Sequence, residues 1–144
     1  AIKNKNPVIA DINNICNKKS GILGVSGISN DNRDVQAAAK EGNERAQLAI
    51  DMQRYQIIKF VGSYIAAMNG VDSIVFTGGI GENDVYIRGE IIKGLTYLGI
   101  EFDESKNAVR GEEVILSAPN SKVTVCVIPT DEEWMIASDT QALI

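Results

Sequence analysis

The glycine-rich stretch FTGGIGEN, Phe76 to Asn83, is the clearest candidate for ligand binding in this sequence. It lies between an apolar run that is typical of a strand and a segment with helical periodicity. Glycine there permits a tight turn and lets a ligand approach backbone N–H groups, which favour polar or anionic ligands at the start of a helix. A βα turn that needs glycine only for its own geometry is the alternative. The added Glu82 and Asn83 favour a nucleotide contact, although the pattern is neither the P-loop nor the dinucleotide-binding motif.

Two acidic groups are further candidates. Asp31 precedes Arg33 in SNDNRD, and either Asp31 or Asn32 can cap a following helix. Glu132 lies in the run TDEEW, where acidic residues in a first helical turn stabilise the helix dipole whether or not they bind a ligand. The chain has no histidine, so any chemistry would depend on carboxylates, Arg, Lys or hydroxyls.

Composition limits the class of protein. The chain has 144 residues, of which 44% are hydrophobic and 23% are charged, and this predicts one globular domain with a core. The net charge is -5 and no run is rich in Lys or Arg, so we expect no nucleic-acid partner. The apolar runs are far shorter than the roughly 20 residues of a membrane span, which predicts no membrane association and a cytoplasmic location. Cys16 and Cys126 are predicted to be reduced thiols used as small hydrophobic residues.

The pattern of apolar residues predicts an α/β domain. A first helix follows Pro7, with Val8 and Ile9 on its apolar side, and an ordered loop covers residues 21–34. Helices are expected at 35–42, 43–69 and 84–97, and strands at 71–77, within 98–117 as a pair, and at 122–130. The run 71–77 is continuously apolar and therefore predicts a strand covered on both faces, in a parallel sheet. A capping box of Thr130 and Glu133 opens a final helix.

Five segments, in order, resemble the C-terminal part of the acetate kinase family, which belongs to the superfamily of acetate and sugar kinases, heat-shock ATPases and actin. They are NKKSG, SGISNDNRD, IVFTGGIGEN, GIEFDESKNAVRG and VIPTDEEWMIASDT. The resemblance implies a ribonuclease H-like, actin-like ATPase lobe with a mixed sheet flanked by helices. Residues 1–144 would form the C-terminal nucleotide-binding lobe of a two-lobe kinase. The chain begins at Ala1 without methionine, which agrees with our expectation of a piece of a longer protein.

The resemblance also implies roles for particular residues. One stretch would hold the adenosine end of ATP or ADP, and a second would form the opposite wall of the same pocket. The first consists of Gly79, Ile80, Gly81, Glu82 and Asn83, and the second of Asp31, Asn32 and Arg33. The guanidinium plane of Arg33 suits stacking on adenine, and Asp31 suits a hydrogen bond to a ribose or an amide. Asn32 departs from the large apolar or aromatic residue usual in the family. Glu132 would be the carboxylate associated with Mg²⁺.

The activity implied by the resemblance is the reversible transfer of the γ-phosphoryl group of ATP to acetate, which gives acetyl phosphate and ADP. The acetate pocket and the catalytic residues are expected upstream, so no catalytic residue is assigned here and the isolated chain is predicted to be inactive. The resemblance further implies a homodimer, and a final helix, from about 130 to 144, that packs on the preceding lobe. The alternatives are a propionate or butyrate kinase and a stand-alone, non-catalytic module for nucleotide binding or dimerisation.

Overall fold

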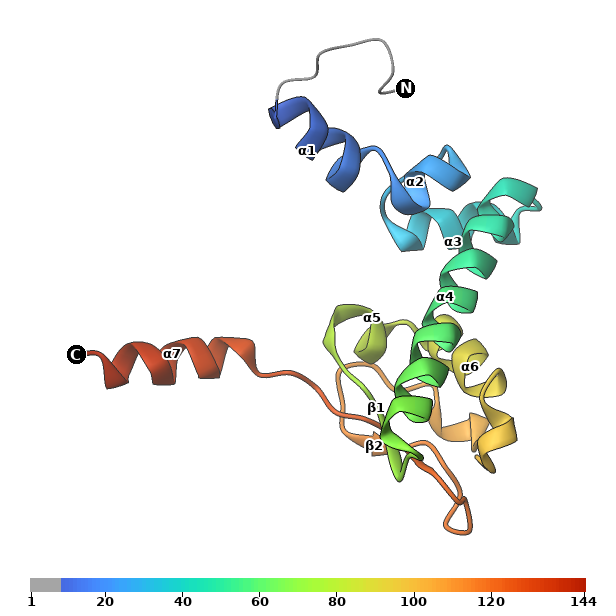
Figure 1. Cartoon of the computed structure of the whole chain (residues 1–144), viewed down its shortest axis with the longest axis vertical. Helices are drawn as coiled ribbons and strands as arrows, with labels where there is room; N and C mark the ends of the chain where they lie inside the picture. The colour runs from blue at the N-terminus through green and yellow to red at the C-terminus, as the bar shows by residue number, and fades with distance from the viewer. Residues whose placement is uncertain (1–8) are drawn as a thin grey trace. The chain divides into compact units, whose positions relative to one another are not determined.

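The computed structural model describes residues 9–144, with the exception of the side chain of Ala10. Pro7 and Val8, the expected start of the first helix, lie outside the described residues. In chain order (Figure 1) the elements are α1 (Ile9–Lys18), α2 (Gly21–Ser26), α3 (Asn32–Lys40), α4 (Glu44–Met68), β1 (Ser73–Phe76), α5 (Gly78–Asn83), α6 (Val85–Lys93), β2 (Val114–Ile115), β3 (Thr124–Val127) and α7 (Glu132–Ala142). The chain divides into two units, Ala1–Ile57 and Ile58–Ile144, and each is described by itself.

The first unit is helical. Its buried apolar side chains belong to α3 and to the first turns of α4, and they are Val35, Ala46, Ala49 and Ile50. Arg45 of α4 donates to the carbonyl oxygen of Val25 through Nε at 2.9 Å and Nη2 at 2.6 Å, which ties α4 to the end of α2.

The prediction of a loop over residues 21–34 is wrong for its first part, because this segment contains the short helix α2. Gly27 adopts the left-handed conformation, with φ 71°, and its N–H donates to the carbonyl oxygen of Leu23. A glycine in this conformation is a common end of a helix. Glycines therefore delimit a six-residue helix here that is too short to show a periodic pattern.

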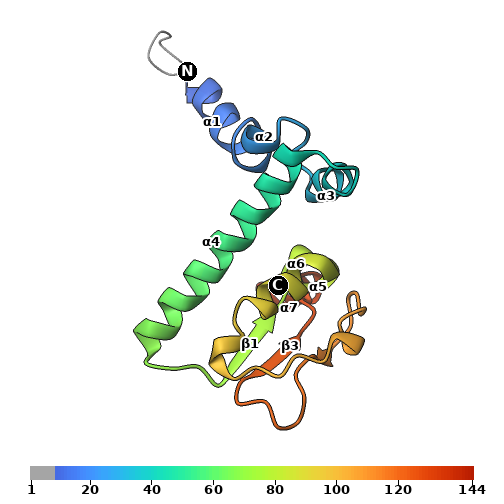
Figure 2. The same cartoon turned by 90° about the vertical axis from the view of Figure 1, so that its right-hand side faces the viewer.

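The second unit contains a three-stranded mixed sheet in the order β1-β3-β2. β1 pairs with β3 in parallel, with Ser73 opposite Thr124, and β2 pairs with β3 in the antiparallel sense; Figure 2 shows β1 and β3 side by side. The buried side chains of this unit come mainly from α6, β3 and the segments beside them: Ile87, Ile91, Ile92, Leu95, Ile100, Leu116, Val123, Val125 and Val127. The predicted mixed sheet flanked by helices is confirmed.

Strand β1 differs from its prediction. Val75 is 46% exposed, and only Ile74 and Phe76 are partly buried. The apolar run therefore forms an edge strand that this chain covers on one face, whereas Val125 and Val127 of the central strand β3 are fully buried. An apolar run identifies a strand, but it cannot tell which chain covers its second face.

Smaller differences follow from local turns. The first strand expected within 98–117 is only an isolated bridge between Phe102 and Ser117. Helix α6 ends at Lys93 rather than near Tyr97, because a 3₁₀ turn over Thr96–Leu98 follows it. Among the described helices, none is long and apolar enough to cross a membrane.

The two cysteines are free thiols with different surroundings. Cys126 is partly buried in β3, and burial raises the pKa of its thiol. Cys16 is exposed on α1, so it does not serve as a buried small hydrophobic residue as predicted.

Candidate functional site

The segments that follow β1 and β3 meet at the carboxyl ends of these strands, which form the carboxyl edge of the sheet. The two strands are parallel, and the N–H of Ile128 donates to the carbonyl oxygen of Phe76 at 3.0 Å, which continues their pairing to the ends of both strands. Helix α5 follows β1, and Thr130 and α7 follow β3. Ligands of open α/β sheets bind at the carboxyl ends of the strands, so this edge is the candidate site.

The glycine stretch is itself helical, which corrects the prediction of a turn with bare amides. Helix α5 has six residues, and Thr77 occupies its N-cap without a side-chain capping bond. The N–H of Gly78 donates instead to Oε1 of Glu82 at 2.8 Å. The first amide of the helix is therefore already bonded within the chain.

The three glycines of α5 are present for different reasons. Gly78 has φ +68°, a backbone conformation that residues other than glycine rarely adopt. A Cβ on Gly81 would lie 3.1 Å from the carbonyl carbon of Phe76, too close to a strand backbone that cannot move easily. Gly79 has no such φ, and a Cβ there would meet no described atom within 4 Å. The local structure thus explains Gly78 and Gly81 but not Gly79.

Glu82 joins the two segments of the site. Glu82 is 9% exposed as a residue, and its Oε1 accepts hydrogen bonds from the N–H of Gly78 at 2.8 Å, the N–H of Thr130 at 2.8 Å and the hydroxyl of Thr130 at 2.9 Å. These bonds, above all the one from the N–H of Thr130, lower the pKa of Glu82. Glu82 was predicted to contact nucleotide, and within this chain its carboxylate holds the segment after β3 against α5.

A buried arginine that the sequence analysis did not identify lies at the other end of α5. Arg88 is 1% exposed and donates through Nη1 to the carbonyl oxygens of Gly81 at 2.7 Å and Glu82 at 3.0 Å. Nη2 donates to the carbonyl oxygens of Asn107 at 2.7 Å and Val109 at 2.9 Å, and Nε donates to Oδ1 of Asn107 at 2.7 Å. All five N–H bonds of the guanidinium can thus be used on neutral oxygens. Burial lowers the pKa of Arg88.

The sequence contained a signal for Arg88. It lies three residues after Val85 and three before Ile91, on the apolar stripe of the helix that the periodicity predicts. A charged residue on such a stripe is buried only when it is bonded. The position in the pattern could therefore have identified it.

The remaining residues of the glycine stretch lie at the surface. Ile80 is 48% exposed, and Asn83 is exposed while its Nδ2 donates to the carbonyl oxygen of Gly79 at 3.1 Å. Both side chains are accessible to a ligand at the carboxyl edge.

Asp31, Asn32 and Arg33 belong to the first unit, so the predicted pairing with the glycine stretch as two walls of one pocket stays a prediction. Asp31 caps α3, because its Oδ1 accepts from the N–H of Arg33 at 2.9 Å. Arg33 also donates to this carboxylate through Nε and Nη2, with the shorter contact at 2.6 Å. The side-chain hydrogen bond from Arg33 is the main cause that lowers the pKa of Asp31 to about 2.

This ion pair leaves Arg33 largely exposed, with 89% of its side chain accessible. The guanidinium edge is occupied by Asp31, which orients the planar group. Asn32 is the first residue of α3 and is partly buried.

Glu132 is the first residue of α7 and is exposed. The predicted capping box is wrong: Asp131 is the N-cap, accepting from the N–H of Trp134 at 3.1 Å, because the hydroxyl of Thr130 is bonded to Glu82. Within the part of the chain that the structure describes, no group of three or more acidic or cysteine side chains could hold a metal. A single exposed carboxylate suits Mg²⁺ only where phosphates and water supply the other ligands.

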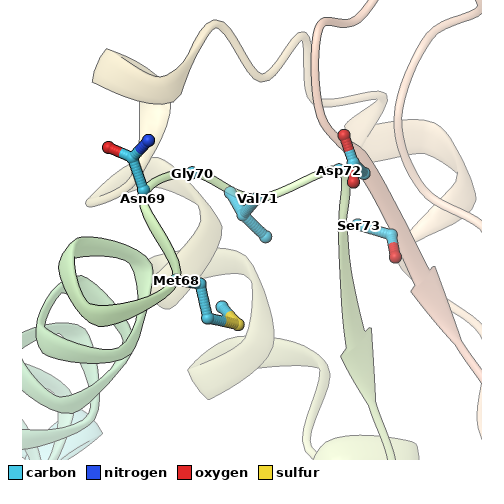
Figure 3. A pocket seen from close by; sticks show the side chains of 6 residues that line it. All are labelled: Met68, Asn69, Gly70, Val71, Asp72 and Ser73. Atoms are coloured by element: carbon cyan, nitrogen blue, oxygen red, sulfur yellow. The ribbon is translucent and has the colours of Figure 1, made fainter.

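A shallow hollow of about 430 Å³ lies at the opposite end of β1 (Figure 3). It is lined by the connection between α4 and β1, which consists of Met68, Asn69, Gly70, Val71, Asp72 and Ser73. It contains none of the predicted site residues, and it lies at the start of β1 whereas α5 follows the end of that strand.

Comparison with known proteins defines the class. The model of the Acetokinase family matches residues 2–138, and the chain belongs to this family. It is 55% identical over 136 residues to the acetate kinase of Acetivibrio thermocellus and 56% identical over 133 residues to that of Phocaeicola vulgatus. These matches cover 94% and 92% of this chain but only 34% and 33% of those relatives, so the chain spans about a third of their length.

Solved structures of the same class match the fold. The acetate kinase of Porphyromonas gingivalis is 53% identical with a TM-score of 0.84, and the match covers 94% of this chain and 34% of that one. The propionate kinase of Francisella tularensis is 43% identical with a TM-score of 0.81, covering 96% and 35%. The predicted actin-like ATPase class is thereby confirmed.

The pH dependence of stability tests the bonds of Glu82. Because the pKa of Glu82 is lower in the folded chain than its ordinary value of 4.5, the carboxylate stabilises the fold above that pH, and this contribution is lost as the pH falls through the lowered pKa. Glu82→Gln is expected to lower the unfolding temperature at pH 7 by a few degrees, and the difference from the unsubstituted protein should shrink below pH 4.5. The exposed Glu112→Gln serves as the control and should change nothing. A difference for Glu82→Gln that is the same at pH 7 and pH 3 would contradict this account.

Proposed function

We propose that the protein containing this chain is an acetate kinase, which transfers the γ-phosphoryl group of ATP reversibly to acetate. The observation that carries the proposal is the identity of 53–56% to several acetate kinases over nearly all of this chain. Phosphoryl transfer depends mainly on positioning and on stabilisation of charge. This chain would supply the part of the site that holds the nucleotide, and the acetate pocket and catalytic residues would lie in the remainder of the protein.

The adenosine end of the nucleotide would lie against α5 at the carboxyl edge of the sheet. Gly79 supports this position, because neither its φ nor a neighbouring atom requires glycine there. A ligand that lies directly on the backbone would require it, since a Cβ would occupy the space of the ligand. Ile80 and Asn83 would contact the nucleotide from the same helix.

The segment Asp31–Arg33 would form the other wall. The ion pair with Asp31 fixes the guanidinium of Arg33 at the surface, where its plane can stack on adenine. Asn32 lies between these two residues, and the large apolar residue that the resemblance implies for this wall is missing there. Mg²⁺ bound with the phosphates would neutralise their charge, and Glu132 would provide one carboxylate toward it.

A propionate kinase is the second candidate, because a solved propionate kinase matches 96% of this chain. The two candidates differ in the acyl group, which this chain is not expected to contact.

Assays of the full-length protein test the activity. We expect formation of acetyl phosphate from acetate and MgATP, with kcat/KM at least about tenfold higher for acetate than for propionate. The isolated 144-residue chain should form none. A higher kcat/KM for propionate would favour the second candidate, and acetyl phosphate formed by the isolated chain would contradict the division of roles. A full-length protein that binds nucleotide but phosphorylates no carboxylate would indicate a non-catalytic module.

Gly79→Ala tests the nucleotide contact. Alanine is favoured over glycine in a helix by up to about 1 kcal/mol, so the unfolding temperature should stay unchanged or rise. The KM for ATP should increase at least about tenfold while the KM for acetate stays within about twofold. Gly24→Ala, at a helical position of α2 with ordinary contacts, is the matched control and should leave both KM values unchanged. An unchanged KM for ATP in the Gly79 variant would contradict the proposed contact between α5 and the nucleotide.

Exposed apolar side chains suggest two covered surfaces in the full-length protein. On α7 and directly after it, Trp134, Ile136 and Leu143 are exposed, and we propose that the preceding lobe covers them. On α4, Phe60 and Tyr64 are exposed, and we propose that a second copy covers them in a homodimer. Hydrogen exchange of the full-length protein should show α7 protected at every concentration and α4 more protected as the concentration rises. Protection of α4 that is independent of concentration down to the nanomolar range would contradict the dimer.

A further inference from the structure

Helix α5 is anchored by oppositely charged side chains at its two ends. The carboxylate of Glu82 accepts the N–H of Gly78 at the first turn, and the guanidinium of Arg88 donates to the carbonyl oxygens of Gly81 and Glu82 at the last turn. Negative charge at the start of a helix and positive charge at its end both stabilise the helix dipole. A six-residue helix is far too short to be stable by itself, so these contacts maintain its form.

Arg88 also fixes where α5 lies. Its planar fork reaches the carbonyl oxygens of Asn107 and Val109 as well as those of α5, and Nδ2 of Asn107 donates to the carbonyl oxygen of Val85 at 2.9 Å. One side chain therefore connects the last turn of α5 with α6 and with the segment around Asn107. Five hydrogen bonds of fixed direction leave little freedom for α5 to shift.

The burial of this charge is costly for stability alone. The five hydrogen bonds of its guanidinium all reach neutral oxygens. Even a buried ion pair can often be replaced by apolar residues of similar volume without loss of stability. Precise placement of the carbonyl oxygens of α5 is a function that an apolar residue could not perform. At 1% exposure, Arg88 cannot itself touch a ligand.

We propose that Arg88 is a positioning residue that holds α5 in the conformation that binds nucleotide. The proposal rests on the proposed function, because it concerns the helix that would carry the adenosine end of ATP. A small displacement of a binding element lowers affinity steeply, so the loss of the fork should act mainly on nucleotide and not on acetate.

The test compares Arg88→Met and Arg88→Lys in the full-length protein. Lys122→Met is the control, because Lys122 is an exposed cation in the same unit. Titration calorimetry with MgADP and steady-state kinetics with ATP and acetate are the measurements. For Arg88→Met we expect the Kd for MgADP and the KM for ATP to rise at least about tenfold, with the KM for acetate within about twofold. Arg88→Lys keeps the charge but not the planar fork, so its Kd for MgADP and its KM for ATP should lie between those of the unsubstituted protein and those of Arg88→Met.

Hydrogen exchange separates positioning from general destabilisation. The N–H of Asp84 donates to the carbonyl oxygen of Ile80, and this amide and its neighbours in α5 should exchange faster in Arg88→Met. The amides of β3 should keep their protection. Uniform loss of protection, together with equal increases in both KM values, would assign Arg88 a purely structural role and overturn the proposal.

Gly89→Ala provides a second variant in case Arg88→Met does not fold. A Cβ on Gly89 would lie 3.1 Å from Nδ2 of Asn107, so alanine should displace this partner of Arg88 by a few tenths of an ångström. A smaller but selective rise in the KM for ATP is expected. Unchanged nucleotide affinity in folded Arg88→Lys and Gly89→Ala would overturn the positioning role while leaving the proposed function intact. An unsubstituted protein that binds no MgADP would overturn both.

Discussion

The candidate site depends on the five hydrogen bonds of one buried guanidinium. Arg88 joins the last turn of α5 to α6 and to residues 107–109, which are about twenty positions further along the chain. Without it, the carbonyl oxygens at the end of α5 would be buried or half-buried groups without a charged donor. The carboxylate of Glu82 performs the complementary task at the first turn, and it extends the same network to Thr130 after β3. Two charged side chains thus determine the geometry of the edge at which the strands end.

This arrangement explains how a small and largely exposed sheet can present a defined site. Only β3 is central, and β1 is half exposed, so apolar burial is limited around the glycine stretch. Directional bonds replace part of the packing there. They connect the two segments that leave the parallel strands, because Glu82 of α5 is bonded to Thr130, which precedes α7.

Much of the fold could be predicted from the sequence, and the differences have identifiable causes. The long helix α4 and the central strand β3 were evident because their apolar residues recur over many positions or form a bounded run. Helices α2 and α5 were missed because six residues are too few to show a period, and glycines at their ends resemble those of a loop. The cap of α7 was assigned to Thr130 because a hydroxyl bond to Glu82, 48 positions earlier, is not visible in a local pattern. Arg88 had a signal in its position on the apolar stripe of α6, but its partners, four backbone oxygens and Oδ1 of Asn107, are not visible in a local pattern.

The three glycines of α5 differ in what would replace them over evolutionary time. Positions 78 and 81 are restricted by the backbone and by Phe76, so any chain with this fold is expected to keep small residues there, with or without a ligand. Position 79 carries no such restriction, and a descendant that no longer holds a nucleotide would be free to accept a side chain. The residue at that single position could therefore distinguish, among distant sequences, those that retain the site from those that retain only the scaffold.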